Sequence, residues 1–233
     1  MFFPYKDDNP RILIPYVTYG IITLNVLIFL FQFGLDRQSS QSLILQFGLT
    51  PAHWTLPSLF TSMFLHGGVA HLLGNMWFMW IFGDNVESAL GHVRYFIFYF
   101  LCGVGAAVTQ TAMDLHSTIP MIGASGAISG VLAAYMIRYP KARVHVFIFL
   151  FIFFTTIRVP AFVVIGFWFF EQLTNGLGTI GLNISGGVAW FAHIGGFIAG
   201  AGLIKLHPLI HIEKFYDQKT SNKKIGCSCY VND

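Results

Sequence analysis

Apolar residues gather in six stretches of the chain that are separated by shorter polar segments. A helix needs about 20 residues to cross a bilayer, and the second, fourth and fifth stretches are short by that measure. Short helices in a bundle indicate a thinned bilayer or water-accessible ends. The pattern predicts an all-α membrane protein, a bundle of six transmembrane helices over 16–206, flanked by an N-terminal segment (1–15) and a basic tail (207–233). The six stretches are 16–35, 69–82, 93–113, 123–137, 160–173 and 190–206.

Two connections between these stretches are unusual. Residues 36–68 are interrupted by Pro51 and Pro57 but are apolar enough to lie at the membrane interface, and we expect short amphipathic helices at their end. Residues 144–154 are mostly β-branched and aromatic and have about half the length of a span. We interpret them as an interfacial or re-entrant segment, with a full span as the alternative.

Composition supports a membrane protein and argues against nucleic acid as a partner. Of the 233 residues, 55% are apolar and 10% are charged, whereas a soluble domain has about 25% charged residues. The net charge of +3 is too small to indicate nucleic-acid binding. Three cysteines make no disulfide framework: Cys102 suits helix packing, while Cys227 and Cys229 lie either in a solvated tail or in a metal site. No signal-peptide pattern is apparent, so we expect the first apolar stretch to persist as a helix.

The basic residues predict the orientation of the helices, because cytoplasmic loops carry an excess of Lys and Arg. Six spans with the N-terminus inside leave only Arg37, of thirteen basic residues, on the outer side. A seventh span at 144–154 would move the C-terminal lysines outside. We therefore expect both termini in the cytoplasm, and the absence of an extra domain favours a bacterial plasma membrane. The residues placed inside are Lys6, Arg11, Arg94, Arg138, Lys141, Arg143, Arg158, Lys205, Lys214, Lys219, Lys223 and Lys224.

Polar residues within the apolar stretches are the candidates for chemistry, because they are costly in lipid. His71 and Asn75, Ser125, and His193 each lie about one turn inside the outer end of the second, fourth and sixth stretch. At 1.5 Å per residue they share one depth. Ser129 and Glu171 are also polar, but we expect Glu171 near the opposite, inner surface.

These residue types suit a serine hydrolase. Ser125 begins a helix in the run GASG, where free backbone N–H groups favour negative charge. Asn75 and His71, four residues apart on one helix face, add donors for an oxyanion hole. His193 can accept the proton of Ser125 and return it to a leaving amine. With no carboxylate at this depth, we interpret the pair as a dyad.

Small residues predict close contact between the fourth and sixth helices. Gly126 and Gly130 form one ridge, and Ala192, Gly196 and Gly200 form another, at the spacing that lets helices approach closely in lipid. Such ridges also occur in proteins where they serve packing alone.

Three motifs in matching order and spacing resemble the rhomboid family: HGGVAHLLGN from His66 to Asn75, GASG around Ser125, and AHIGGFIAG around His193. The resemblance covers about residues 56–206. It implies a six-helix bundle, serine endopeptidase activity on transmembrane substrates at or just within the bilayer, and no metal or cofactor. It further implies that Asn75 and His71 serve the oxyanion and that Glu87, in the run GDNVE, is structural.

Two positions depart from the family pattern. Trp54 is followed by Thr55 where many members have Arg, and Ser129 stands where a Tyr often supports the histidine ring. The sequence therefore does not identify the residues that support the first loop and the His193 ring. Both reactive residue types are present, which argues against an inactive relative.

Other functions were weighed against this one. A transporter needs polar groups along the whole bundle, but here they stop in the outer third. A zinc site from His66, His71 and His193 lacks a carboxylate or thiolate partner at that depth.

The charge-free loop 174–189 contains five glycines, and we expect it to cap the site. The sequence identifies neither the substrate nor the oligomeric state.

Overall fold

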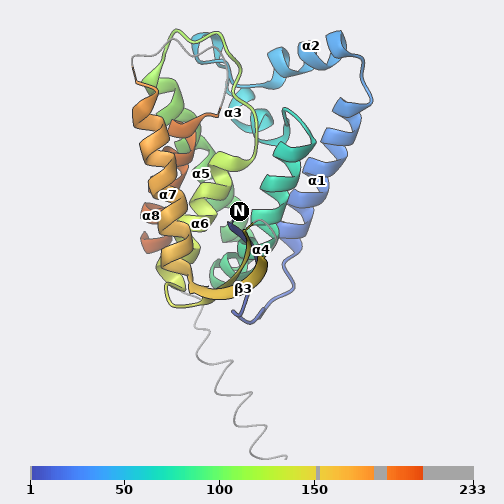
Figure 1. The fold of residues 1–233 in the computed structure, drawn as a ribbon. Helices are drawn as coiled ribbons and strands as arrows, with labels where there is room; N and C mark the ends of the chain where they lie inside the picture. The colour runs from blue at the N-terminus through green and yellow to red at the C-terminus, as the bar shows by residue number, and fades with distance from the viewer. Residues whose placement is uncertain (1, 151–152, 181–187, 207–233) are drawn as a thin grey trace, which may run out of the picture.

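The computed structural model describes residues 2–150, 153–180 and 188–206, which form a helical bundle with a small sheet at one end (Figure 1). The helices α2 and α3 lie at the opposite end of the bundle from the sheet. The elements are β1 (Phe2–Asp7), α1 (Tyr16–Phe33), α2 (Arg37–Phe47), η1 (Pro51–His53), α3 (Ser58–Thr61), η2 (Ser62–Phe64), α4 (Val69–Leu90), α5 (His92–Met113), α6 (Ser125–Arg138), β2 (Arg143–Leu150), β3 (Phe153–Pro160), α7 (Ala161–Gly178) and α8 (Trp190–Leu206).

The six longest helices of the described residues, α1, α4, α5, α6, α7 and α8, correspond to the six predicted stretches. Helix α6 is short, with 14 residues, but the expectation of a short second helix is wrong, because α4 has 22 residues. Its last eight residues, 83–90, are partly polar and yet all buried, so hydropathy alone misjudged where the helix ends. Helix α7 has 18 residues and continues five residues beyond the predicted end.

Length and apolar character identify fewer spans than the six predicted. Among the described residues, α1 and α5 are the two helices long and apolar enough to cross a membrane, and α8 is a shorter apolar helix. The count of six spans therefore stays a prediction. The predicted tail 207–233, with its two cysteines, and most of the predicted cap beyond Ile180 lie outside the described residues.

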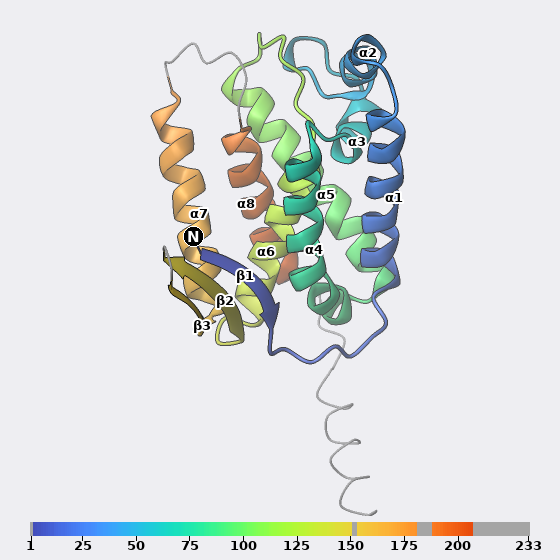
Figure 2. The same ribbon diagram turned by 45° about the vertical axis from the view of Figure 1, so that its right-hand side comes forward.

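Residues 144–150 and 153–154 belong to an antiparallel sheet, so the re-entrant interpretation and the alternative of a full span are wrong for them. The described chain is mostly helical, as predicted, but it is not all-α. Strand β2 pairs with β3 from Arg143↔Pro160 to Leu150↔Phe153, and with the N-terminal strand β1 from Phe2↔Ile148 to Asp7↔Val144. Figure 2 shows the three strands side by side, in the order β1-β2-β3. β-branched and aromatic residues suit a half-buried pleated surface, and pairing satisfies the backbone polar groups.

Helix α1 has its polar side chains on the inside. Thr18, Asn25 and Gln32 are buried at intervals of seven residues, about two turns, whereas Leu27 and Phe31 are among its exposed large apolar residues. In water this arrangement would expose apolar surface and bury polar groups, which is unfavourable on both counts. It suits a helix whose outer face contacts lipid.

The closest packing in the bundle is that of α8 against α6, and it depends on glycine. A Cβ atom at Gly196 would overlap the backbone carbonyl of Gly126, and one at Gly200 would overlap the backbone of Gly130. The two small-residue ridges predicted from the sequence therefore meet face to face. Their contact holds the first residue of α6 close to the first turn of α8.

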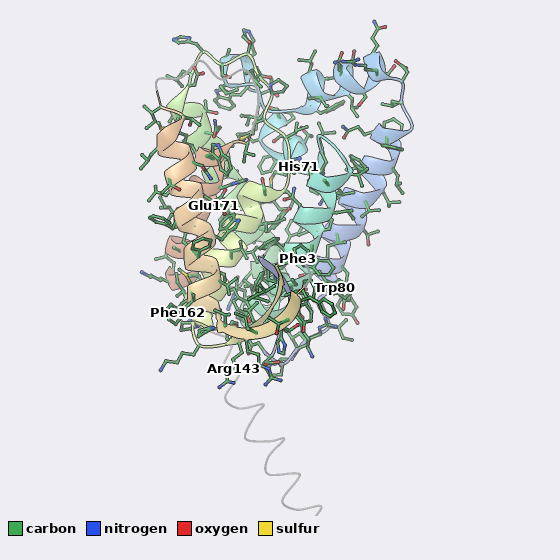
Figure 3. The ribbon with its side chains drawn as sticks, viewed as in Figure 1. Phe3, His71, Trp80, Arg143, Phe162 and Glu171 are labelled. Carbon is green, nitrogen blue, oxygen red and sulfur yellow. The ribbon has the colours of Figure 1, made fainter. Side chains whose placement is uncertain are left out.

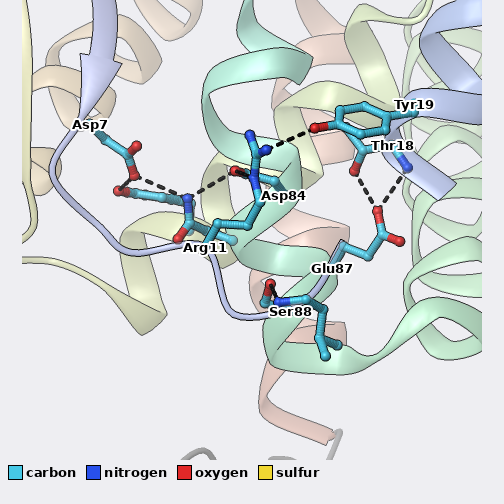
Figure 4. Close-up of polar contacts among 10 residues, drawn as sticks. Asp7, Arg11, Thr18, Tyr19, Asp84, Glu87 and Ser88 are labelled. Atoms are coloured by element: carbon cyan, nitrogen blue, oxygen red, sulfur yellow. Dashed lines mark hydrogen bonds and ion pairs between the residues drawn. The ribbon is translucent and has the colours of Figure 1, made fainter. Parts of the chain in front are cut away.

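Glu87 caps the start of α1 (Figure 4). Its carboxylate accepts hydrogen bonds from the backbone N–H of Val17 (2.9 Å) and from the backbone N–H (2.8 Å) and hydroxyl (2.7 Å) of Thr18. It also contacts His92 Nδ1 at 2.6 Å. These N–H groups have no partner within the helix, so a fully buried carboxylate stabilises the helix end.

The segment between β1 and α1 is tied to α4 and α6 by a second polar cluster. Arg11 forms an ion pair with Asp84 at 3.0 Å and donates to the Tyr19 hydroxyl (Figure 4). Asp7, the last residue of β1, accepts hydrogen bonds from the Tyr135 hydroxyl in α6 and the Asn85 amide in α4. Burial raises the pKa of Asp7 to about 6, although the Tyr135 hydrogen bond acts in the opposite direction.

Candidate active site

Ser125 and His193, the two residues predicted to react, are in direct contact. Ser125 is the first residue of α6 rather than one turn inside it, and His193 lies in the first turn of α8. The distance between Ser125 Oγ and His193 Nε2 is 2.8 Å. A hydroxyl hydrogen-bonded to an imidazole is the arrangement of a nucleophile with its general base.

The two predicted oxyanion residues lie beside the segment that leads into Ser125. Asn75 projects from α4 towards Gly123, as does His71, which is labelled in Figure 3. A Cβ atom at Gly123 would lie 2.7 Å from His71 Cε1 and 3.6 Å from Asn75 Nδ2, and the φ angle of +122° also disfavours any other residue there. The absence of a side chain lets donors from α4 approach the backbone at the start of α6.

His66 orients Asn75, a role that the sequence did not predict. The imidazole is fully buried, and its Nε2 lies 2.9 Å from Asn75 Nδ2. Its backbone is held in turn by the Gln32 side chain of α1, which donates to the His66 carbonyl at 2.7 Å. An amide nitrogen carries two hydrogens, so Asn75 keeps one for a ligand in the cavity.

The His193 ring is supported by α7 and not by α6. Gln172 Oε1 lies 2.7 Å from His193 Nδ1, and the ring centroids of Trp168 and Trp190 lie 5.9 and 6.3 Å from that of the imidazole. Ser129, at the position of the family tyrosine, donates to the Ser125 carbonyl at 2.7 Å within its own helix. The sequence interpretation missed Gln172, although a polar residue in an apolar helix is the signal that would have found it.

The expected position of Glu171 is wrong. This residue directly precedes Gln172, so it lies at the level of His193 and not at the opposite surface (Figure 3). It is exposed, whereas Gln172 is buried on the other face of α7. The predicted topology itself places Glu171 on the outer side, because a fifth helix that runs from the inner to the outer surface has its last residues outside, and the expected inner position overlooked this direction. The group that faces Nδ1 of His193 is therefore an amide.

A cavity of about 630 Å³ contains the four candidate residues. Its size is within the range of ligand-binding pockets, about 300–1,000 Å³. Besides Ser125, His193, Asn75 and His71, its walls include apolar residues of α4, α5 and α6 and the residues just before α8. The polar groups thus converge at one point of a largely apolar pocket, which suits a peptide segment better than a free ion.

Two hydrogen bonds stabilise the first loop at the position where many family members have an arginine. Thr55 and Ser58 bond reciprocally: the Ser58 hydroxyl accepts from the Thr55 N–H at 3.0 Å, and the Thr55 hydroxyl accepts from the Ser58 N–H at 3.3 Å. This pair fixes the turn into α3.

The alternative zinc site receives no support from the geometry. His66 Nε2 contacts Asn75, and both ring nitrogens of His193 are bonded to Ser125 and Gln172. Within 2–150, 153–180 and 188–206, no three His, Cys, Asp or Glu side chains are grouped to share a metal ion.

Comparison with known proteins identifies the family of the chain. The family model of the Rhomboid domain matches residues 53–207, which is more than half of the chain and includes all four candidate residues. The chain belongs to the rhomboid family.

Named relatives include proteins from bacteria and plants. The chain is 31% identical to rhomboid protease GluP of Bacillus subtilis, over 81% of this chain and 35% of that protein. It is 28% identical to rhomboid protease AarA of Providencia stuartii, over 79% and 70% of the two chains. It is 32% identical to RHOMBOID-like protein 4 of Arabidopsis thaliana, over 61% and 32%. The chain thus spans about a third of the length of several relatives.

Proposed function

We propose that this protein is an intramembrane serine endopeptidase that cleaves transmembrane segments of membrane proteins near the outer membrane face. The observation that carries the proposal is the 2.8 Å contact between Ser125 Oγ and His193 Nε2, inside a cavity that also holds Asn75 and His71. Membership of the rhomboid family supports the same reaction.

The first half of the reaction forms an acyl-enzyme. His193 Nε2 takes the proton of Ser125 as Oγ attacks the scissile carbonyl carbon. The negative charge on the carbonyl oxygen is stabilised by the amide of Asn75, an N–H of His71 and the free backbone N–H groups at the start of α6. His193 then donates its proton to the leaving amine as the C–N bond breaks.

The second half uses water. His193 accepts a proton from a water molecule, the hydroxide adds to the acyl carbon, and collapse of the second tetrahedral intermediate returns the proton to Ser125. The base must therefore present the same nitrogen to Ser125 and to water in turn. Water has to reach the cavity for this step, so we infer that the residues before α8 and the outer part of α7 separate to admit water and substrate.

The membrane arrangement that goes with this mechanism has six spans, both termini in the cytoplasm, and Ser125 a few ångströms below the outer surface. The lipid bilayer and transmembrane substrates are then the partners. The exposed apolar faces of α1 and α7 support this arrangement, because Leu27, Phe31, Phe162 and Phe167 all point outward.

The proposal is tested with purified protein in detergent micelles, incubated with a generic transmembrane peptide whose products are identified by mass spectrometry. We expect Ser125→Ala and His193→Ala each to abolish cleavage, because residues that act as one unit lose nearly everything when either is removed. A fluorophosphonate probe should label the wild-type protein at Ser125 and fail to label Ser125→Ala. Normal turnover by folded Ser125→Ala would show that the nucleophile is another residue.

A chelator separates this mechanism from the metal alternative. A serine and histidine need no Lewis acid, so EDTA or phenanthroline should leave both peptide cleavage and probe labelling unchanged. Loss of cleavage that added zinc restores would instead favour the site of His66, His71 and His193.

A further inference from the structure

Gln172 of α7 lies next to the proposed general base. It is 4% exposed, and its Oε1 is 2.7 Å from His193 Nδ1, the ring nitrogen that does not face Ser125. Resting on the proposed function, we propose that Gln172 is the positioning residue of the site. It holds His193 in the tautomer that carries the proton on Nδ1, so that Nε2 is free to accept the proton of Ser125.

The orientation of the Gln172 amide is fixed by its second partner. Its Nε2 donates to the backbone carbonyl of Trp168 at 3.3 Å, one turn earlier in the same helix. A carbonyl only accepts, so the amide nitrogen must face Trp168 and the amide oxygen must face His193. That oxygen also only accepts, and Nδ1 of His193 must therefore be the donor. The network leaves a single assignment of the imidazole proton.

The ring is held in place by the same helix. Trp168 lies four residues before Gln172, so both side chains project from one face of α7 towards His193. Trp190 of α8 approaches the ring edge-on, with an angle of 89° between the planes. Ser129 gives no support from α6, because its hydroxyl is bonded to Ser125 O. In this chain, the base is thus supported by side chains of α7 and α8 and not by the helix that carries Ser125.

Helix α7 has few other buried positions. Only Ala161, Ile165, Gln172 and Gly176 of its 18 residues are buried, and they form one narrow stripe. An outward tilt of α7 that widens the cavity would withdraw Gln172 from His193. The base is consequently oriented for catalysis only while α7 rests against α8.

The test is the rate of fluorophosphonate labelling of Ser125 by the full chain in detergent micelles, because a small probe needs an active serine but no docked peptide. Gln172→Met keeps the length of the side chain and removes the acceptor. We expect it to lower the second-order labelling rate roughly 10- to 100-fold, because Nδ1–H is left buried without a partner and the second tautomer becomes accessible. Peptide cleavage should lose kcat with little change in KM.

Gln172→Glu is the conservative variant, because it keeps an acceptor at the same place. It should retain labelling within about fivefold of wild type at high pH, where His193 is neutral. A carboxylate beside Nδ1 favours the imidazolium, so the acid limb of the rate profile should move to higher pH. The shift shows that position 172 faces Nδ1, and retention of the rate in Gln172→Glu beside its loss in Gln172→Met separates a required acceptor from packing, because both variants fill the same space.

Gln110→Met is the matched control. Gln110 Oε1 also bonds the start of α8, accepting from the Ala192 N–H at 3.0 Å, but it does not contact the imidazole. We expect its pH profile to match that of wild type. If Gln172→Met labels as fast as wild type, or if Gln172→Glu leaves the acid limb in place, the positioning role is wrong. If Gln172→Met does not fold, the pH dependence of the labelling rate of Gln172→Glu decides whether the proposal holds. Failure of the wild-type protein to label at all would instead contradict the proposed function.

Discussion

Helices α6 and α7 both serve the candidate site, but they are packed in opposite ways. In α6, ten consecutive residues from Gly126 to Tyr135 are buried. In α7 only four residues are buried, and large apolar side chains such as Phe167, 69% exposed, point away from the bundle. The nucleophile is thus fixed by packing on all sides of its helix, whereas the base is oriented by single contacts from a helix at the edge. Close packing of α6 therefore fixes the position of Ser125, whereas a hydrogen bond from α7 sets the orientation of the His193 ring.

The largest effect should come from filling the contact between α6 and α8. Gly196→Ala places a methyl group where the Gly126 carbonyl lies, so the helices must separate. Overpacking of this kind costs about 1–3 kcal/mol, and a displacement of about 1 Å between reacting groups can cost 100-fold in rate. We expect a lower thermal midpoint and at least a 100-fold loss of peptide cleavage.

The matching substitution in α7 is the control. Gly166 has nothing within 4 Å of its missing Cβ, so Gly166→Ala should leave activity unchanged and stabilise the helix by up to about 1 kcal/mol. Equal losses in the two variants would show that α6 and α7 do not differ in packing as described.

A smaller effect is expected at the oxyanion position of α4. Asn75→Ala removes a donor that acts mainly in the transition state, so kcat should fall roughly 10- to 1,000-fold while KM changes little. Steady-state kinetics on a transmembrane peptide measures both parameters. Leu73→Ala, on the exposed face of the same helix, should behave as wild type. A change in KM alone would make Asn75 a residue of substrate binding.

The smallest effect concerns the far end of α6, where Asp7 meets Tyr135. The folded protein raises the pKa of Asp7 from 3.8 to about 6, so it binds this proton more tightly than the unfolded chain does. The contribution of Asp7 to the free energy of unfolding should therefore be most favourable below about pH 4, and it should decrease as the pH rises through 6. Asp7→Asn keeps the acceptor oxygen and removes the titration, so it should be more stable at pH 7 by about 1–3 kcal/mol.

Thermal unfolding of wild type and Asp7→Asn between pH 4 and pH 7 measures this difference. The two curves of midpoint against pH should diverge as the pH rises, and the labelling rate of Ser125 should be the same in both proteins. Parallel curves would mean that Asp7 titrates normally, and a changed labelling rate would mean that the two ends of α6 are coupled.

The sequence predicted the site residues that belong to motifs at fixed spacing better than the single polar residues that lie outside such motifs. Ser125, His193, His71 and Asn75 follow from motifs at fixed spacing, and the glycines of α6 and α8 follow from theirs. Gln172 and Gln32 were not found, because neither belongs to a motif at fixed spacing and the partner of each lies on another element. The sheet was missed although the apolar run in β2 has the composition of a strand and pairs with β3, which follows directly. The run was interpreted as a membrane segment because it is short and apolar, and its other partner, β1, is at the other end of the chain.

The pairing of β1 with β2 has a topological consequence. Asp7 and Tyr135 are 128 residues apart, and the strands beside them can pair only if both lie on the same side of the bilayer. The chain must therefore cross the membrane an even number of times between β1 and β2. The proposed spans α1, α4, α5 and α6 meet this parity condition, and residues 144–148 cannot themselves cross the bilayer because they pair with β1. A few backbone hydrogen bonds in a small sheet thus restrict the arrangement of the whole bundle.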